Sequence, residues 1–294
     1  MKIVKDNAIP VLDSVAAVAG DYDAFIVDLW GVVHDGLTAY PGILDALNGL
    51  RRDGRRVMLL SNAPRRAATV RQKVRSVGVP DSFYDHLLSS GEAGHLALRD
   101  RSDPVHAGLG HRFFHIGAPW DEDVFQGLDY EKVAALDAAD WILNTGIKHI
   151  SETVDLFEET LARARDRGLP MVCTNPDLVV MQGEVMGICA GMLAKRYEEL
   201  GGTAHYHGKP HRGVYEICLE TLGNPAPSRV LAIGDSFRTD IKGANLMGFD
   251  SLLVTQGIHA GDLTRNGRPD GALIAEAAAG EAARPTYAIR SLTW

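Results

Sequence analysis

The feature that most constrains this chain is the alternation of short, continuously apolar runs with longer segments of helical period. Continuous apolar runs are typical of parallel strands covered on both faces, and their alternation with helices is typical of βαβ units. The sequence therefore predicts an α/β protein built on parallel sheets. The predicted strands are Ala24–Val27, Val57–Leu60, Phe113–Ile116, Trp141–Leu143, Met171–Cys173, Val230–Ile233 and Leu252–Val254, and the helical segments are Ile43–Arg52, Ala67–Val77, Glu152–Arg167 and Val214–Leu222.

Composition and charge exclude several classes of protein. The 294 residues carry a formal net charge of −8, which argues against a broad surface for nucleic acid. Cys173, Cys189 and Cys218 lie far apart without a Cys-x-x-Cys pair, which argues against a disulfide framework or a structural zinc site. No apolar run reaches the length of a membrane span, and Asp6 and Pro10 interrupt any signal-peptide core. We expect a cytoplasmic protein with neither nucleic-acid nor membrane partners.

Three predicted strands run directly into polar residues that are suited to catalysis. One ends at Asp28, the next at Ser61 and Asn62, and a later one just before Asp235. Ligands of an open parallel sheet bind outside the carboxyl ends of its strands, so these residues can share one crevice. Each of them alone fits the cap of a following helix equally well. Their combination with Lys209, in Gly-Lys-Pro, favours a shared site.

Phosphoryl transfer is the chemistry that these residue types allow. The carboxylate of Asp28 is a competent nucleophile toward phosphorus, and enzymes do form aspartyl phosphates. Attack by one anion on another requires positive charge, which a divalent cation and a lysine can supply. Asp235 and Asp240, on one loop, are ligands of the kind that Mg²⁺ prefers. The predicted phosphate-binding groups are Ser61, the backbone N–H of Asn62, and Lys209.

The spacing of these residues predicts two domains. About one βαβ step separates Asp28 from Ser61, and another separates Lys209 from Asp235. The stretch between Ser61 and Lys209 is long enough for an inserted domain. We expect a core domain of residues 1–86 plus 206–294 and an inserted domain of residues 87–205.

The order and spacing of four motifs resemble those of the haloacid dehalogenase superfamily of hydrolases. The motifs are Asp-Leu-Trp-Gly-Val from Asp28, Leu-Leu-Ser-Asn around Ser61, Gly-Lys-Pro around Lys209, and Gly-Asp-Ser-x-x-Thr-Asp at 234–240. More narrowly, the chain resembles the class IIA branch, with its NagD-like sugar phosphatases and its pyridoxal and 4-nitrophenyl phosphatases, which Tyr40-Pro41-Gly42 also fits.

This resemblance implies a Rossmann-like core, a large inserted α/β cap of the C2 type, and Mg²⁺-dependent hydrolysis of a small phosphorylated metabolite. The substrate would be a sugar phosphate or an activated phosphate, and Asp28 would carry the aspartyl-phosphate intermediate. A homodimer is compatible with this interpretation. The implied metal ligands are Asp28, the Trp30 carbonyl, Asp235 and Asp240, and the implied catalytic residues are Asp28 and Lys209.

The chain departs from the family pattern at Trp30. The pattern places there an aspartate that protonates the leaving group and then activates water, whereas an indole has one N–H donor and no acid–base function. General acid–base catalysis contributes about 10²–10⁴ in rate. Three explanations stay open: a substrate with a good leaving group, such as an acyl phosphate; another acid, with His34 and Asp35 as candidates; or a catalytically weak protein that binds a phosphorylated ligand or has a regulatory role.

Two further groups are weaker candidates. Thr174, Asn175 and Asp177 follow a strand of the inserted domain and resemble a Thr-Asn-x-Asp stretch that selects substrate in the related branch, although a turn with a helix cap is an equal alternative. Three histidines flank Lys209. They are expected to line a cleft or bind backbone, with a zinc site as the minor alternative, and they are His205, His207 and His211.

Overall fold

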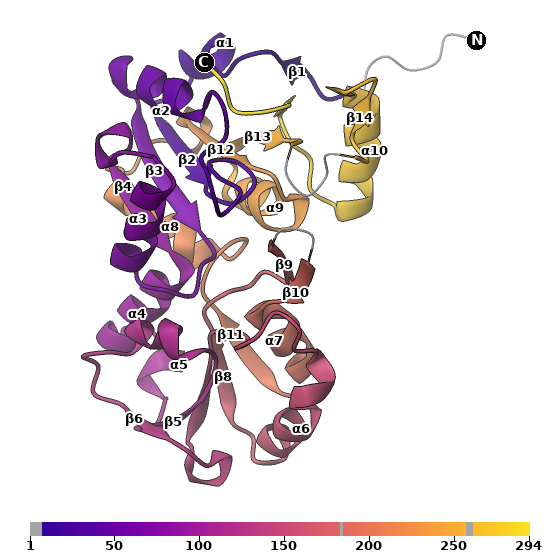
Figure 1. The fold of residues 1–294 in the computed structure, drawn as a ribbon. Coiled ribbons are helices and arrows are strands. Elements are labelled where there is room, and N and C mark those ends of the chain that lie inside the picture. Colours follow the sequence, from indigo (N-terminus) through magenta and orange to yellow (C-terminus); the bar gives the residue numbers. More distant parts are fainter. Residues whose placement is uncertain (1–7, 183–184, 257–260) are drawn as a thin grey trace. The chain divides into compact units, whose positions relative to one another are not determined.

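The computed structural model describes residues 8–182, 185–256 and 261–294 (Figure 1). Contacts divide the described chain into two compact units. The first falls within Met1–Ser61, Arg71–Leu88 and Tyr215–Trp294, and the second within Asn62–Val70 and Ser89–Val214. The domain limits expected from the spacing, 1–86 plus 206–294 and 87–205, stay a prediction.

The first unit is built on a seven-stranded sheet of the described residues, in the order β1-β16-β13-β12-β2-β3-β4. The pairings from β1 through β3 are parallel. Its strands are β1 (Val11–Leu12), β2 (Ala24–Asp28), β3 (Arg56–Ser61), β4 (His86–Ser89), β12 (Val230–Gly234), β13 (Asp250–Val254) and β16 (Tyr287–Ile289). Segments far apart in the sequence, such as β2 and β12, therefore lie side by side (Figure 1).

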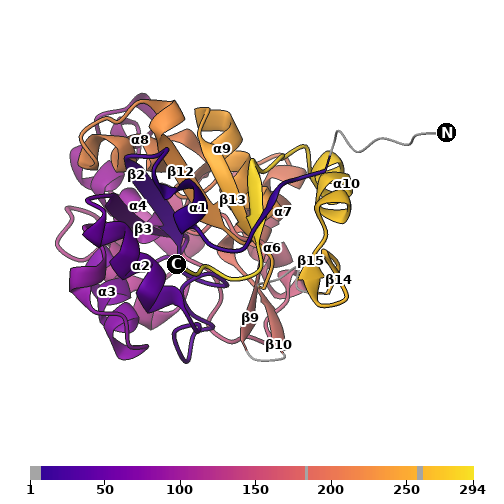
Figure 2. The same ribbon diagram turned by 90° about the horizontal axis from the view of Figure 1, so that it is seen from above.

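Helices cover both faces of this sheet, with α1 and α2 on one side and α8 and α9 on the other (Figure 2). The helices are α1 (Ala16–Ala19), α2 (Ile43–Arg52), α3 (Ala67–Ser76), α8 (Arg212–Thr221), α9 (Lys242–Met247) and α10 (Gly271–Glu281), and a short antiparallel pair joins β14 (Thr264–Arg265) to β15 (Arg268–Pro269). The α2 residues Ile43, Ala46, Leu47 and Leu50 are buried, which is the spacing of one helical face. Such a face requires cover, and the sheet provides it.

The second unit is built on a five-stranded parallel sheet of the described residues, in the order β11-β8-β7-β5-β6. Its elements are β5 (Arg112–Ile116), β6 (Glu131–Val133), β7 (Trp141–Asn144), β8 (Pro170–Cys173), β11 (Thr203–Tyr206), α4 (Ser90–Asp100), α5 (Pro104–Ala107), α6 (Glu158–Asp166) and α7 (Ala190–Glu199), with the antiparallel hairpin β9 (Val179–Gln182) and β10 (Val185–Ile188). One core cluster of this unit holds Ile142, Leu161 and Tyr197, whose hydroxyl donates to the Leu169 carbonyl over 2.6 Å.

Short helical turns connect these elements. They are η1 (Asp81–Phe83), η2 (Pro119–Val124), η3 (Leu136–Ala138), η4 (Val154–Phe157) and η5 (Pro227–Arg229), together with one π turn, η6 (Phe237–Ile241). Every strand that the sequence predicted is present, as β2, β3, β5, β7, β8, β12 and β13, so the α/β class with parallel sheets is confirmed. No helix in the described part of the chain combines the length and the apolar character that a membrane span needs.

Two helical glycines of the first unit give a matched test of packing against helix propensity. A Cβ at Gly49, in α2, would overlap the indole of Trp294, whereas a Cβ at Gly280, in α10, would meet no atom. Alanine in a helix is favoured over glycine by up to about 1 kcal/mol. We expect Gly280→Ala to raise the free energy of unfolding slightly. Gly49→Ala should lower it by about 1–3 kcal/mol, because overpacking outweighs propensity. Urea unfolding of both variants checks this, and equal shifts would contradict it.

Candidate active site

Three carboxylates converge at the carboxyl ends of adjacent strands. Because β12 pairs with β2 with Ile233 opposite Val27, the residues after β12 emerge beside Asp28, the last residue of β2. Ligand oxygens of Asp28, Asp235 and Asp240 all lie within 4.8 Å of one another. All three side chains are buried, with exposed fractions of 8%, 6% and 4%. The structure thus brings together the three aspartates that the sequence singled out.

Two glycines make this convergence possible. Gly31 has a φ of 78°, and a Cβ there would overlap the carboxylate of Asp235. A Cβ at Gly234 would likewise overlap the side chain of Asp240. Asp240 is held from its own turn, where its Oδ2 accepts from the Ser236 N–H and the Thr239 hydroxyl, each over 3.3 Å. The sequence analysis gave these glycines no role of their own.

The trio fits a hard divalent cation. Three like charges buried this closely repel one another strongly, and a cation among them removes that repulsion. Carboxylate oxygens are the donors that Mg²⁺ and Ca²⁺ take, and no soft ligand stands among them. The groups that would hold the ion are therefore oxygens of the first unit.

In the second unit, the side chain of Asn62 holds the backbone of Lys209. The Lys209 N–H donates to Asn62 Oδ1 over 2.7 Å, and Asn62 Nδ2 donates back to the Lys209 carbonyl over 3.1 Å. Both side chains are nearly fully buried. The preceding residue, Gly208, has a φ of 119°, and its close neighbours include Ser90 and Asn62. Residues that are 147 apart in the sequence are thus joined by a reciprocal amide pair.

Three family models match this chain. Models described as haloacid dehalogenase-like hydrolase match residues 25–131 and 91–248, and one described as HAD-hydrolase-like matches 206–293. The second of them spans more than half of the chain. The chain belongs to the haloacid dehalogenase-like hydrolases. It falls in their class IIA branch, as the motifs predicted, and it is an enzyme of phosphatase type.

Known relatives of this hydrolase agree with that assignment. A haloacid dehalogenase-like hydrolase from Brucella suis has a crystal structure that matches with a TM-score of 0.82 at 34% identity, covering 96% of this chain and all of that one. The sugar phosphatase AraL of Bacillus subtilis is 27% identical over 79% of this chain and 82% of its own. A glycerol phosphate phosphatase from Mycobacterium tuberculosis, crystallised with calcium, shares the fold at a TM-score of 0.66 and 21% identity, over 92% of this chain and 74% of that one.

Trp30 is fixed by its own loop in this hydrolase. Its ring packs edge-on against the ring of His34, with 5.2 Å between the centroids, and it covers Gly36 so closely that a Cβ there would overlap it. The side chain remains 39% exposed. The indole therefore forms part of the surface of the loop after β2, and it has no acid–base function.

Both substitute acids considered from the sequence are engaged in the turn of the loop. His34 is buried, its Nδ1 accepts from the Gly36 N–H over 3.0 Å, and burial lowers its pKa to about 4, with Lys73 adding to the effect. Asp35 is exposed, and the Thr38 and Leu37 N–H groups, each 2.8 Å away, hold its pKa below the ordinary value. Near neutral pH, His34 carries no proton on Nδ1 and Asp35 is a carboxylate, so each serves the turn of the loop.

The proposed substrate stretch of the hydrolase is tied to Asn62. Asp177 Oδ1 accepts from Asn62 Nδ2 over 2.8 Å, and the Asp177 N–H donates to Asn175 Oδ1 over 3.1 Å. The hydroxyl of Thr174 is fully buried and has no hydrogen-bond partner. Asp177 thus has a structural contact to a motif residue, which the sequence could not reveal, and the role of the stretch in substrate selection stays a prediction.

The histidines around Lys209 make contacts of other kinds. His207 Nε2 lies 3.0 Å from Nε2 of His106, whose Nδ1 lies 2.6 Å from Asp103, and burial lowers the pKa of His207 to about 3. His211 stacks on Tyr206 with 4.9 Å between the ring centroids. Among the described residues, only the aspartate trio forms a group of three metal-binding side chains, so nothing favours the zinc alternative.

The buried histidine predicts a pH-dependent stability. The pKa of His34 is about 4 in the folded protein, and 6.5 is the ordinary value, which we take for the unfolded chain. Between pH 4 and pH 6.5 the unfolded chain therefore binds more protons than the folded protein. Folding free energy is therefore lost as the pH falls through this window, by about 2 kcal/mol at about pH 5. In His34→Asn, whose side-chain oxygen can replace the Nδ1 acceptor, we expect that part of the loss to disappear. Urea unfolding at about pH 7.5 and pH 5 measures it. The control is His86→Asn, an exposed position, which should behave as the wild type.

Proposed function

We propose that this hydrolase removes the phosphoryl group from a small phosphorylated metabolite through an aspartyl phosphate on Asp28, with Mg²⁺ as cofactor. The observation that carries this proposal is the buried convergence of Asp28, Asp235 and Asp240 at the ends of adjacent strands. The names of the relatives AraL and glycerol phosphate phosphatase support a sugar phosphate or polyol phosphate as substrate. A cytoplasmic location and a homodimer stay predictions of the sequence.

The proposed metal ligands are the carboxylates of Asp28, Asp235 and Asp240 and the backbone carbonyl of Trp30. Mg²⁺ bound there would neutralise charge on the phosphoryl oxygens and on the aspartates. Calcium in a related phosphatase supports a divalent ion of the hard class. The proposed phosphoryl-binding groups are Ser61, Asn62 through its backbone N–H, and Lys209.

The proposed reaction has two steps. A carboxylate oxygen of Asp28 attacks phosphorus, a P–O bond to Asp28 forms, and the P–O bond to the leaving group breaks. Water then hydrolyses the aspartyl phosphate, which releases inorganic phosphate and restores the carboxylate. Lys209 would offset the negative charge of the transferring group in both steps. Thr174, Asn175 and Asp177 are proposed to limit the substrate that enters.

The leaving group decides how fast the first step proceeds. Trp30 has no acid function, Asp35 is a carboxylate at neutral pH, and the neutral His34 is buried with its Nδ1 engaged by the Gly36 N–H. An alkoxide leaving group therefore departs without protonation by these residues, whereas an acyl phosphate or aryl phosphate needs little help. We propose that activated phosphates are the better substrates of this enzyme.

Phosphate release from a panel of substrates tests the function. We expect the wild type with Mg²⁺ to hydrolyse acetyl phosphate and 4-nitrophenyl phosphate faster than sugar phosphates. Asp28→Asn should abolish release from all of them. Trp30→Asp should raise turnover of alkyl phosphates by about 10²-fold, because it restores an acid at this position.

The outcomes of this assay separate the alternatives. Release from no member of the panel by the wild type, together with release by Trp30→Asp, would favour a protein that binds a phosphorylated ligand without turnover. Residual activity of Asp28→Asn at the wild-type level would overturn the aspartyl-phosphate route.

The cation can be tested without turnover. Saturating Mg²⁺ stabilises a protein that binds it only when folded, by about 2.7 kcal/mol at a hundred times its Kd. We expect Mg²⁺ to raise the Tm of the wild type and to leave that of Asp235→Asn almost unchanged. Asp45→Asn, an exposed substitution in α2, is the control and should respond as the wild type. Equal responses of Asp235→Asn and the wild type would contradict the assignment.

A further inference from the structure

We propose that the turn Ser89–Glu92, at the start of α4, is a positioning element that holds together the two chain segments carrying Asn62 and Lys209. Its function as a positioning element rests on the proposed role of these two residues in phosphate binding. The sequence analysis assigned nothing to this turn. The turn makes contacts on two sides, all of them within the second unit.

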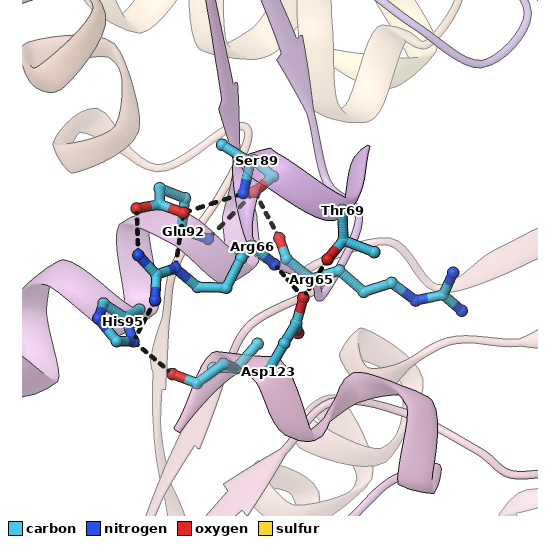
Figure 3. A network of polar contacts seen from close by, with 9 residues as sticks. Arg65, Arg66, Thr69, Ser89, Glu92, His95 and Asp123 are labelled. Atoms are coloured by element: carbon cyan, nitrogen blue, oxygen red, sulfur yellow. Dashed lines mark hydrogen bonds and ion pairs between the residues drawn. The ribbon is translucent and has the colours of Figure 1, made fainter. Parts of the chain in front are cut away.

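On one side, the turn forms hydrogen bonds with the segment that follows Asn62 (Figure 3). Glu92 accepts two hydrogen bonds from the Arg66 guanidinium, of 2.7 and 3.0 Å, and a third from the Ala67 N–H over 2.9 Å. Ser89 Oγ donates to the Arg65 carbonyl over 2.5 Å and accepts from the Glu92 N–H over 3.1 Å. The turn is thus both the N-cap of α4 and the anchor of the segment.

The backbone packing at this contact is equally close. The Gly91 N–H donates to the Ala63 carbonyl over 3.0 Å. A Cβ at Gly91 would overlap the backbone of Pro64 and Arg65. The segment from Asn62 onward therefore lies directly against the first turn of α4, and only glycine fits there.

On the other side, the turn holds the segment that leads to Lys209. The hydroxyl of Ser90 donates to the carbonyl of His207. A Cβ on Gly208 would lie 2.5 Å from Ser90 Oγ and 2.6 Å from Asn62 Oδ1. Both polar groups therefore pack so closely against this glycine that a side chain has no room there. The reciprocal amide pair between Asn62 and Lys209 then closes a ring of contacts.

The charges in the ring favour a fixed geometry. Burial opposes ionisation of Glu92, but the Arg66 guanidinium and the Ala67 N–H hold its pKa below the ordinary value. A bidentate arginine–carboxylate pair restricts both orientation and distance. A second carboxylate, Asp123, accepts from the Arg66 N–H over 3.1 Å and from the Thr69 hydroxyl over 2.6 Å, which secures the next turn of the segment (Figure 3).

Phosphate binding needs such a support. Groups that stabilise a transferring phosphoryl group act through preorganisation, and small displacements of them lower the rate strongly. None of Ser89, Ser90 and Glu92 is proposed to touch the substrate. Their contribution is to fix the backbone of two residues that are proposed to do so, which makes them positioning residues.

Glu92→Gln and Ser90→Ala test this inference against a matched control. Glu158→Gln removes the charge from another bidentate pair of the second unit, in which Arg196 donates to Glu158 over 2.9 and 2.5 Å. We expect all three variants to fold. Glu92→Gln and Ser90→Ala should raise the Ki for inorganic phosphate and lower kcat/KM by about fivefold to tenfold. Glu158→Gln should move neither, and Ser90→Thr, which keeps the hydroxyl, should recover most of the loss.

Hydrogen exchange supplies a readout that does not depend on activity. The amides of residues 207–209 and 211, which include the Lys209 donor to Asn62, should exchange about fivefold faster in Glu92→Gln and Ser90→Ala than in Glu158→Gln and the wild type. Unchanged exchange in that segment would overturn the proposal even in an active enzyme. A wild type that releases no phosphate would instead contradict the proposed function, while faster exchange in the variants would still support the role of the turn.

Discussion

The structure of the site depends on one unfavourable interaction, the burial of three aspartates whose ligand oxygens lie within 4.8 Å of one another. Like charges at such distances repel strongly outside water. The fold brings them together because Asp28 ends β2, Asp235 follows the neighbouring β12, and Asp240 lies in the short turn after it. Main-chain geometry therefore imposes the convergence, and two glycines remove the side chains that would prevent it.

The residues of the proposed site lie in two different units of the chain. The first unit contains the three carboxylates, the proposed nucleophile Asp28 included, and Ser61 ends its β3. The second contributes Lys209 and Asn62, which are locked to each other through amide groups. The three carboxylates and Lys209, the proposed positive charge, are therefore all buried side chains, and hydrogen bonds to Asn62 hold the backbone of Lys209.

The loop after β2 shows how a departure from a family pattern can be accommodated. The resemblance implies an acid at the position of Trp30. The loop forms a compact turn, because His34 accepts from the Gly36 N–H and Asp35 accepts from the N–H groups beyond it. The polar side chains nearest in sequence, His34 and Asp35, form hydrogen bonds with the backbone of the turn. The proposed phosphoryl-transfer site therefore combines the converging carboxylates with a loop whose nearest polar side chains hold its own turn.

The sequence alone determined the fold class, and it singled out the three aspartates that converge in the structure. Continuous apolar runs are typical of buried strands, and polar residues that directly follow three of these runs lie at one edge of a parallel sheet. Asp28, Ser61 and Asp235 could therefore be singled out as candidates without coordinates. Asp240 followed from its place in a motif. The strands and the convergence of the three aspartates could be predicted because they rest on local periodicity and on short-range order in the chain. The chemical roles of these residues stay proposals.

Only the tertiary structure decided what supports those residues. Nothing in the local sequence around Ser89–Glu92 distinguishes it from any other capped helix start, and its contacts reach segments as far as 117 residues away. The side-chain amide of Asn62, the engagement of His34 and the crowding at Gly31 and Gly234 were equally invisible. Such features depend on which backbones meet in three dimensions, and long-range contact leaves no periodic trace in a single sequence.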